Sequence, residues 1–223
     1  LAVIVGLVAA VAELFPFGHM HAIQVYNTQP AKLATFEGLL EGQAQAPFLL
    51  FGIPVGDRIV ADVRVPGLLS LFIDGSTDSF VQGRNNFPPE DLPPLLLPFA
   101  GFHLMVGLGM LFITLMAYGV LQLYRGKLWH DRLYLICLVL AIPLPVIACQ
   151  LGWIAAEVGR QPWIVYGMLR TKDAISMTVP ASHILFSLIM FGGLYLFLFI
   201  SYLWFMVRAV KQEAAASLSE KGV

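Results

Sequence analysis

A carboxylate and a guanidinium, Glu157 and Arg160, lie three residues apart at the end of a long apolar run. Charged side chains are expensive to place in a bilayer, so such residues usually serve a function. The carboxylate could ligate a metal, relay protons or form a structural ion pair with Arg160. Trp153 lies four residues before Glu157 and therefore on the same face of a helix, where it could contact a cofactor or simply pack against a neighbouring helix.

A histidine and a methionine, His103 and Met105, lie within a second apolar run. Both types of side chain serve as axial ligands of haem iron. Two positions apart on a helix, they point in directions about 200° apart and cannot bind the same iron. The alternative for Met105 is ordinary core packing, which methionine serves in most proteins.

A lysine and a glutamate, Lys32 and Glu37, lie in the run QPAKLATFE, residues 29–37. We expect a helix here that begins near Pro30, because proline is favoured in a first helical turn. Five positions apart, the two charged residues do not share one helix face, but they can flank a site. The alternative is a solvated amphipathic helix on the surface.

The remaining histidines and the two cysteines carry weaker signals. Cys137 and Cys149 lie in one apolar run and fit no metal-ligand or redox spacing. We expect His19 and His21 on the surface of a loop. His183, near the start of the last apolar run, is a candidate for a proton path, a haem propionate contact or the membrane interface.

The composition indicates a membrane protein. Of the 223 residues, 58% are hydrophobic and only 12% are charged, whereas soluble domains carry about 25% charged residues. The net charge of −1 and the lack of a basic stripe argue against a nucleic-acid partner.

Three apolar runs, residues 95–124, 133–156 and 179–207, are each long enough to span a bilayer, which takes about 20 residues. Pro143 and Pro145 should kink the second. Residues 1–17 are shorter, and we interpret them as the end of a transmembrane helix in a longer or a split polypeptide. The predicted fold is an all-α membrane helix bundle with three complete transmembrane helices and one partial helix.

The basic residues predict the orientation, because short cytoplasmic loops are rich in lysine and arginine. Arg125, Lys127 and Arg132 lie between the first two complete spans. We therefore expect the C-terminus in the cytoplasm and residues 18–94 outside. Within that segment we expect an irregular stretch over residues 18–28, a helix over residues 28–40 and a strand over residues 48–54. Residues 95–223 would form a three-helix membrane region with a cytoplasmic tail.

Three motifs resemble those of subunit I of the cytochrome bd quinol oxidases. The most specific is GRQPW, residues 159–163, which follows Glu157 at the family's spacing. The second is QPAK-x-A-x-x-E, residues 29–37, and the third is F-x-x-M, residues 102–105. The resemblance covers essentially the whole chain. The family's N-terminal helices, which carry its histidine haem ligands and two glutamates of its proton path, have no counterpart here.

The resemblance implies roles for the residues above. Met105 would ligate a low-spin haem b, and Glu157 would ligate a high-spin haem. Arg160 would hold a haem propionate. Two further residues receive less definite roles: Trp153 could pack between haems, and His103, a position that is often arginine in relatives, would touch a propionate or the quinol site. Lys32 and Glu37 would contact quinol in the outer loop or take its protons.

The resemblance also implies the function of the complex. Quinol would be oxidised at the outer face and oxygen reduced to water, which builds a proton-motive force without pumping. The implied cofactors are a low-spin haem b, a high-spin haem b, and haem d or a second high-spin haem b. The implied partners are quinol, oxygen, lipid, the N-terminal part of subunit I in the same or another chain, subunit II and small single-helix subunits. The location would be a bacterial or archaeal cytoplasmic membrane.

Two other functions compete with this one. A non-catalytic bd-like paralogue, or a split subunit that supports a membrane electron-transfer complex, would retain the motifs without reducing oxygen. A transporter that uses Glu157 and Arg160 as a relay would leave QPAK-x-A-x-x-E unexplained. A missing chlorin haem in the spectrum of the complex would favour the paralogue.

Overall fold

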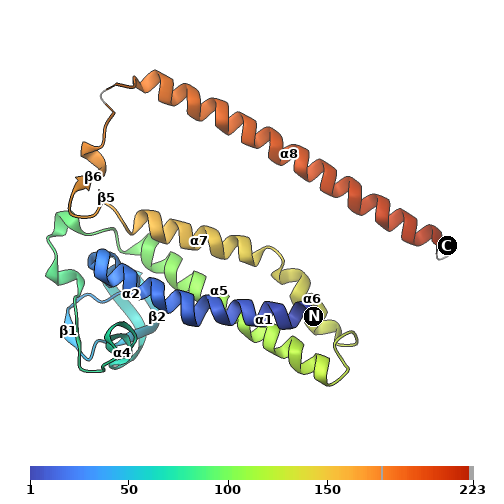
Figure 1. Ribbon diagram of the computed structural model, residues 1–223, viewed down its shortest axis with the longest axis horizontal. Coiled ribbons are helices and arrows are strands. Elements are labelled where there is room, and N and C mark those ends of the chain that lie inside the picture. Colours follow the sequence, from blue (N-terminus) through green and yellow to red (C-terminus); the bar gives the residue numbers. More distant parts are fainter. Residues whose placement is uncertain (177, 221–223) are drawn as a thin grey trace. The chain divides into compact units, whose positions relative to one another are not determined.

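The computed structural model describes residues 1–176 and 178–220, which form two compact units, Leu1–Ala174 and Ile175–Val223 (Figure 1). The described residues contain four helical stretches that are long and apolar enough to cross a membrane. The predicted class, an all-α membrane bundle, is therefore confirmed. The first stretch, for which we expected only a partial span, has 27 residues and is long enough by itself.

The first stretch continues where the sequence predicted it to end. Helix α1, Ala2–Ala12, runs into a π-helical turn η1, Glu13–Gly18, and then into α2, His19–Thr28. The expected end at residue 17 and the expected irregular stretch over residues 18–28 are thus wrong. Pro16 lies inside the π-helical turn. A local π adjustment lets a helix continue past a residue that has no backbone N–H, and this explains the error.

The next two spans match their predictions. Helix α5 covers Leu96–Tyr124, with Pro98 in its first turn. The third stretch is divided into α6, Arg132–Ala141, and α7, Leu144–Val158. The interruption falls at residues 142–143, just before and at the first of the two prolines expected to kink it.

The second compact unit contains helix α8, Ala181–Glu220. It begins within two residues of the predicted start at residue 179, but it extends past residue 207, where we expected it to end. Lys211, Gln212 and the alanines that follow are good helix formers, so the helix continues beyond its apolar part. His183 is exposed in the first turn of this helix.

Glycines let the helices of the first unit approach closely. A Cβ placed on Gly6 of α1 would lie 2.8 Å from Sδ of Met116 in α5, and one on Gly101 of α5 would lie 2.9 Å from the carbonyl oxygen of Leu151 in α7. Small residues at such crossings are typical of membrane helices, because they allow backbone contact. Helix α5 thus packs between α1 and α7.

The segment between the first helix and α5 is folded. It contains α3, Pro30–Phe36, and α4, Leu68–Asp74. Its strands β2, Phe48–Val55, and β3, Arg58–Val65, form an antiparallel hairpin, and β1, Gln43–Ala44, pairs with β4, Phe80–Val81. Short 3₁₀ turns cover Arg84–Asn86 and Pro89–Asp91. The predicted helix and strand are confirmed, although the helix ends at Phe36 rather than at residue 40.

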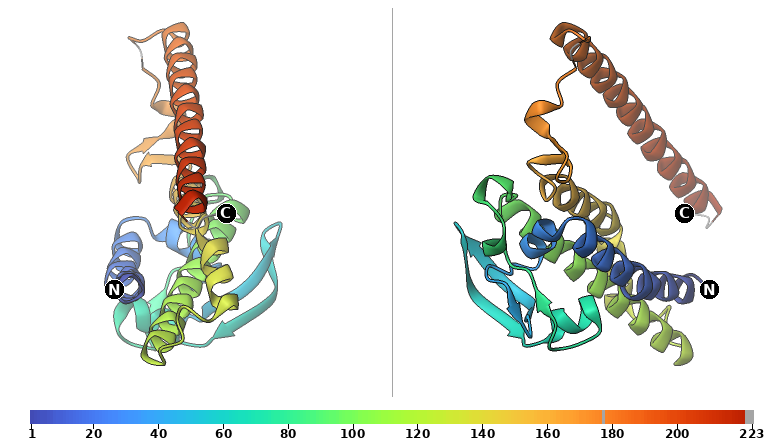
Figure 2. Two further views of the ribbon diagram at one scale, coloured as in Figure 1. Left: turned by 90° about the vertical axis from the view of Figure 1, so that its right-hand side faces the viewer. Right: turned by 60° about the vertical axis from the view of Figure 1, so that its left-hand side comes forward.

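Two small hydrophobic cores hold this segment onto the ends of the helices. One core joins α2, α3 and α4 through Val25, Leu33 and Leu69. The other joins β2 to α5 through Leu49, Leu95 and Phe99. The hairpin therefore lies beside the first turns of α5, as both views in Figure 2 show.

A buried arginine that the sequence analysis did not single out braces α3. Arg84 is 9% exposed, and its Nη1 donates to Oγ1 of Thr35 at 2.6 Å and to the carbonyl oxygen of Pro93 at 3.0 Å. Its backbone N–H donates to the carbonyl oxygen of Leu39 at 2.9 Å. One residue thus connects α3, the chain after it and the segment that leads into α5.

Replacing Arg84 should make local opening of α3 easier without unfolding the helix bundle. In Arg84→Met, the free energy of local opening of residues 30–40 should fall by roughly 1.5–3 kcal/mol, the range for hydrogen bonds made by charged groups. Hydrogen exchange of the α3 amides measures this directly. Arg58→Met, at the exposed tip of the hairpin, is the matched control. Equal exchange in both variants would show that Arg84 does not hold α3.

Candidate functional site

The three motifs meet at one end of the first unit. The rings of Phe36, in α3, and Phe102, in α5, are stacked with their centroids 5.0 Å apart. A Cβ on Gly159, just after α7, would lie 2.7 Å from Cε1 of Phe36. Phe36 thus fits between the start of α5 and the end of α7, which brings the segments of QPAK-x-A-x-x-E, F-x-x-M and GRQPW together.

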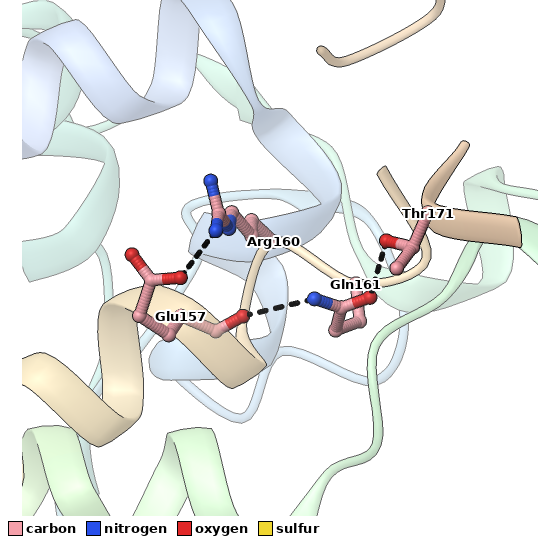
Figure 3. Close-up of polar contacts among 4 residues, drawn as sticks. All are labelled: Glu157, Arg160, Gln161 and Thr171. Carbon is pink, nitrogen blue, oxygen red and sulfur yellow. Dashed lines mark hydrogen bonds and ion pairs between the residues drawn. The ribbon is translucent and has the colours of Figure 1, made fainter. Parts of the chain in front are cut away.

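Glu157 and Arg160 form an ion pair through Oε2 and Nη2 (Figure 3). Gln161 Nε2 donates to the carbonyl oxygen of Glu157 at 3.5 Å, and Thr171 Oγ1 donates to Oε1 of Gln161 at 2.8 Å. The two charged side chains are 37% and 39% exposed. The ion pair that the sequence allowed as an alternative is therefore present. It engages one carboxylate oxygen and leaves Oε1 with no hydrogen bond to the described residues.

A second ion pair holds the turn that follows. Arg170 Nη2 donates to Oδ1 of Asp91 at 2.6 Å, and the guanidinium lies 4.9 Å from the ring centroid of Trp163. Trp163 and Arg170 face each other across the paired strands β5, Trp163–Val165, and β6, Leu169–Arg170. Sequence reasoning did not pair Asp91 with Arg170, because the two residues are 79 positions apart in the chain.

Lys32 links α3 electrostatically to the ion pair. It is 9% exposed, and its Nζ lies 5.6 Å from the ring centroid of Phe36. Burial lowers the pKa of Lys32, and the nearby positive charge of Arg160 lowers it further, while Glu157 opposes the shift. The structure therefore places Lys32, which was predicted to contact quinol, close enough to Arg160 and Glu157 for their charges to shift its pKa. A solvated surface helix, the alternative from sequence, is wrong.

Glu37 is a buried carboxyl without a charged partner. It is 5% exposed, and burial raises its pKa to about 8. Its Oε2 has no hydrogen-bond partner among the described residues. Such a carboxyl can hold or release a proton near neutral pH, which is what a group that exchanges protons with a substrate requires.

His103 and Met105 point to different sides of α5, as their spacing requires. His103 contacts the carbonyl oxygen of Phe99 through Nδ1 at 3.0 Å and that of Leu49 in β2 through Nε2 at 3.2 Å. Met105 instead faces α7, where a Cβ on Gly152 would meet its Sδ at 2.6 Å. In the structure His103 fastens the hairpin to α5.

The other expected residues are placed as follows. Trp153 is 63% exposed on α7, so most of its indole is available to groups beyond the described packing. His19 and His21 are exposed as predicted, but they lie on helix α2 rather than in a loop. Cys137 and Cys149 are free thiols.

Several unpartnered polar atoms near this end of the unit fit the groups of a haem enzyme. Arg160 Nε and Trp163 Nε1 are buried donors with no partner among the described residues. Two such donors suit a carboxylate such as a haem propionate, whereas Glu37 Oε2 suits a hydroxyl group. Met105 offers a thioether and Glu157 a carboxylate, both of which are groups that can ligate a metal. Among the described residues, no three His, Cys, Asp or Glu side chains gather into a metal site.

Comparisons with known proteins identify relatives of this chain. The family model for cytochrome bd terminal oxidase subunit I matches residues 1–214. The chain is 32% identical to cytochrome bd ubiquinol oxidase subunit 1 of Bacillus subtilis, over 96% of this chain and 48% of that protein. It is 27% identical to cytochrome bd-II ubiquinol oxidase subunit 1 of Escherichia coli, over 97% of this chain and 55% of that protein.

A solved structure shows the same fold. The bd oxidase from Geobacillus thermodenitrificans superposes with a TM-score of 0.75 and 29% identity, over 92% of this chain and 47% of that chain. The chain thus spans about half the length of the relatives it matches. Since the family model covers nearly all of it, the chain belongs to the cytochrome bd terminal oxidase subunit I family.

Proposed function

We propose that this chain is the part of a terminal quinol oxidase that carries the quinol-oxidising loop and one ligand for each of two haems. The proposal rests on the contact between α3 and the end of α7. There the charges of Glu157 and Arg160 lie close enough to Lys32 to shift its pKa. A quinol-binding helix and a haem-binding helix must lie close together for electrons to pass between them.

At the quinol site, Glu37 and Lys32 would handle protons. Oxidation of a quinol to a quinone releases two protons and two electrons. The ionised form of Glu37 accepts one hydroxyl proton, and it is a stronger base than an ordinary carboxylate because burial raises its pKa to about 8. Lys32, whose pKa is lowered, can orient the second oxygen and pass its proton outward. The two electrons would pass to the haem that Met105 would help to hold.

At the haem sites, each residue has a distinct task. The haems, when bound, supply one-electron transfer and the iron at which oxygen is reduced. Met105 provides the thioether ligand of a low-spin haem b, and Glu157 provides the carboxylate ligand of a high-spin haem b. The third cofactor is haem d or a second high-spin haem b. Arg160 holds a propionate, and Trp153 packs between haems.

The ion pair and the ligand role of Glu157 are compatible. A carboxylate has two oxygens, and only Oε2 is engaged with Arg160. Oε1 remains for an iron, while Arg160 keeps its Nε for a propionate. The pair would therefore orient the ligand rather than replace it.

Other parts of the complex would supply the remaining haem ligands. The family's N-terminal helices, in the same or another chain, would provide the opposing histidine ligands. Subunit II and small single-helix subunits would complete the assembly in a bacterial or archaeal cytoplasmic membrane. The loop between the first helix and α5 would face outward and the C-terminus would face the cytoplasm. Protons are then released on one side and consumed from the other.

Met105→Leu in the assembled oxidase should abolish the six-coordinate spectrum of the low-spin haem b. The fold should remain, because this exchange conserves side-chain volume. Reduced-minus-oxidised spectra measure the effect. Met110→Leu, on the same helix at an exposed position, is the control and should leave the spectrum unchanged. A retained low-spin signal in Met105→Leu would refute the ligand assignment.

Glu37→Gln and Lys32→Ala should each impair quinol-driven oxygen consumption by roughly 10²-fold, the typical loss when a proton-transferring group is removed. Haem content and oxygen reduction from an artificial electron donor should stay near the unmodified level. Lys172→Ala, an exposed lysine outside the motif, is the control. An equal fall with the artificial donor would contradict the quinol role.

The same Glu37→Gln variant tests the burial of the Glu37 carboxyl group independently of activity. The folded protein binds a proton at Glu37 up to pH about 8, whereas the unfolded chain releases it near 4.5, the ordinary pKa of glutamate. The free energy of unfolding should therefore fall as the pH rises through this window. Glu37→Gln removes that fall, so its thermal stability should depend less on pH.

Glu157→Ala should cause the greatest loss of high-spin haem. Breaking a fully buried pair costs about 3–5 kcal/mol, whereas exposed pairs contribute about 0–1 kcal/mol. This pair is more than a third exposed, so its loss alone should not unfold the chain. The measurement is high-spin haem per protein in Glu157→Ala and in the double variant with Arg160→Ala. Recovery in the double variant would mean that Glu157 is only an ion-pair partner.

A further inference from the structure

A third glutamate, Glu13, lies far inside the first helix and takes no part in the site above. It begins the π-helical turn η1. Turns of this kind inside α-helices occur frequently at functional sites. Among the described residues, no basic side chain lies within ion-pair distance of its carboxylate.

The packing of α1 on α5 gives the depth of Glu13. The two helices are antiparallel, since Gly6 lies beside Met116 and Val3 lies beside Gly119 (Figure 1). Seven residues beyond Gly6, Glu13 therefore comes level with Gly109. Gly109 lies at the middle of the 29-residue helix α5. The depth follows from this register and does not depend on where the chain begins.

The surroundings at this depth are apolar. Helix α5 contains no Asp, Glu, Lys or Arg, and its titratable residues are His103, Tyr118 and Tyr124. On its own helical stretch, the nearest titratable residues are His19 and His21, more than a turn away. Glu13 itself is exposed in the described unit. A lone anion at this depth of a bilayer is costly, and such residues usually mark ion or proton pathways.

Glu13 lies between the two ends of the bundle. Gly101 of α5 packs beside Ala155 of α7, so Glu157 is level with the start of α5. At about 1.5 Å per residue, the level of Glu13 is roughly 15 Å farther along α5 than that of Glu157. The remaining half of α5 leads to the end that carries Arg125 and Lys127, which is the cytoplasmic end in the proposed orientation.

We propose that Glu13 is a proton-carrying carboxyl that relays protons from the cytoplasmic half of the membrane toward the oxygen-reducing centre. This inference rests on the proposed function, since reduction of oxygen to water takes up one proton for each electron. Glu13 gives its proton toward that centre and takes another from the cytoplasmic side, so that the carboxyl is restored in each cycle. The electrons come from quinol and do not pass through it.

The test uses the complete oxidase with Glu13→Gln, which keeps the shape and polarity but cannot release a proton. Haem content and thermal stability should be unchanged, while oxygen consumption with excess quinol should fall by roughly a hundredfold. Glu13→Asp should restore part of it. Glu41→Gln, an exposed carboxylate in the outer segment, is the control and should remain active.

A second measurement does not depend on turnover. The infrared difference spectrum between oxidised and reduced enzyme should contain a protonated-carboxyl band that Glu13→Gln removes. Unchanged turnover or an unchanged spectrum would overturn the proposal. Loss of haem or of assembly in Glu13→Gln would also overturn it, because Glu13 would then be a structural partner. An unmodified complex that reduces no oxygen would instead refute the proposed function.

Discussion

The stacked rings of Phe36 and Phe102 hold α3 against the first turns of α5, and Gly159 leaves the space that Phe36 needs at the end of α7. This contact determines the surroundings of Lys32, Glu157 and Arg160. It brings Lys32 near Glu157 and Arg160 and encloses the helix that ends at Phe36. A larger residue at 159 would push Phe36 away and separate the QPAK-x-A-x-x-E segment from the GRQPW segment.

Burial then determines the chemistry of the two charged residues on α3. Removing a carboxyl from water favours its protonated form, so the pKa of Glu37 rises to about 8. Removing an ammonium group from water has the opposite effect on Lys32. The two pKa values therefore move toward each other, which suits an acid and a base that handle the protons of one substrate. Arg84 maintains this burial from the other side of α3.

The two ion pairs at this end of the first unit position side chains more than they stabilise the fold. Glu157 with Arg160 and Asp91 with Arg170 are both partly exposed, and such pairs contribute little to folding. Their geometry matters more. Arg170 holds the turn after GRQPW against Trp163 and the segment before α5, while Arg160 fixes one oxygen of Glu157. The arrangement leaves the other oxygen in a defined direction.

The sequence by itself determined the membrane class, the kink before Leu144, the strand at Phe48 and the motif residues, because hydropathy, proline geometry and spacing are local properties. Only the tertiary structure decided that the first helix continues past Pro16 and that Lys32 and Glu37 are buried. It also revealed the brace of Arg84 on Thr35, 49 residues away. The burial and the brace depend on contacts between distant segments, and no local pattern in the sequence encodes which segments will meet.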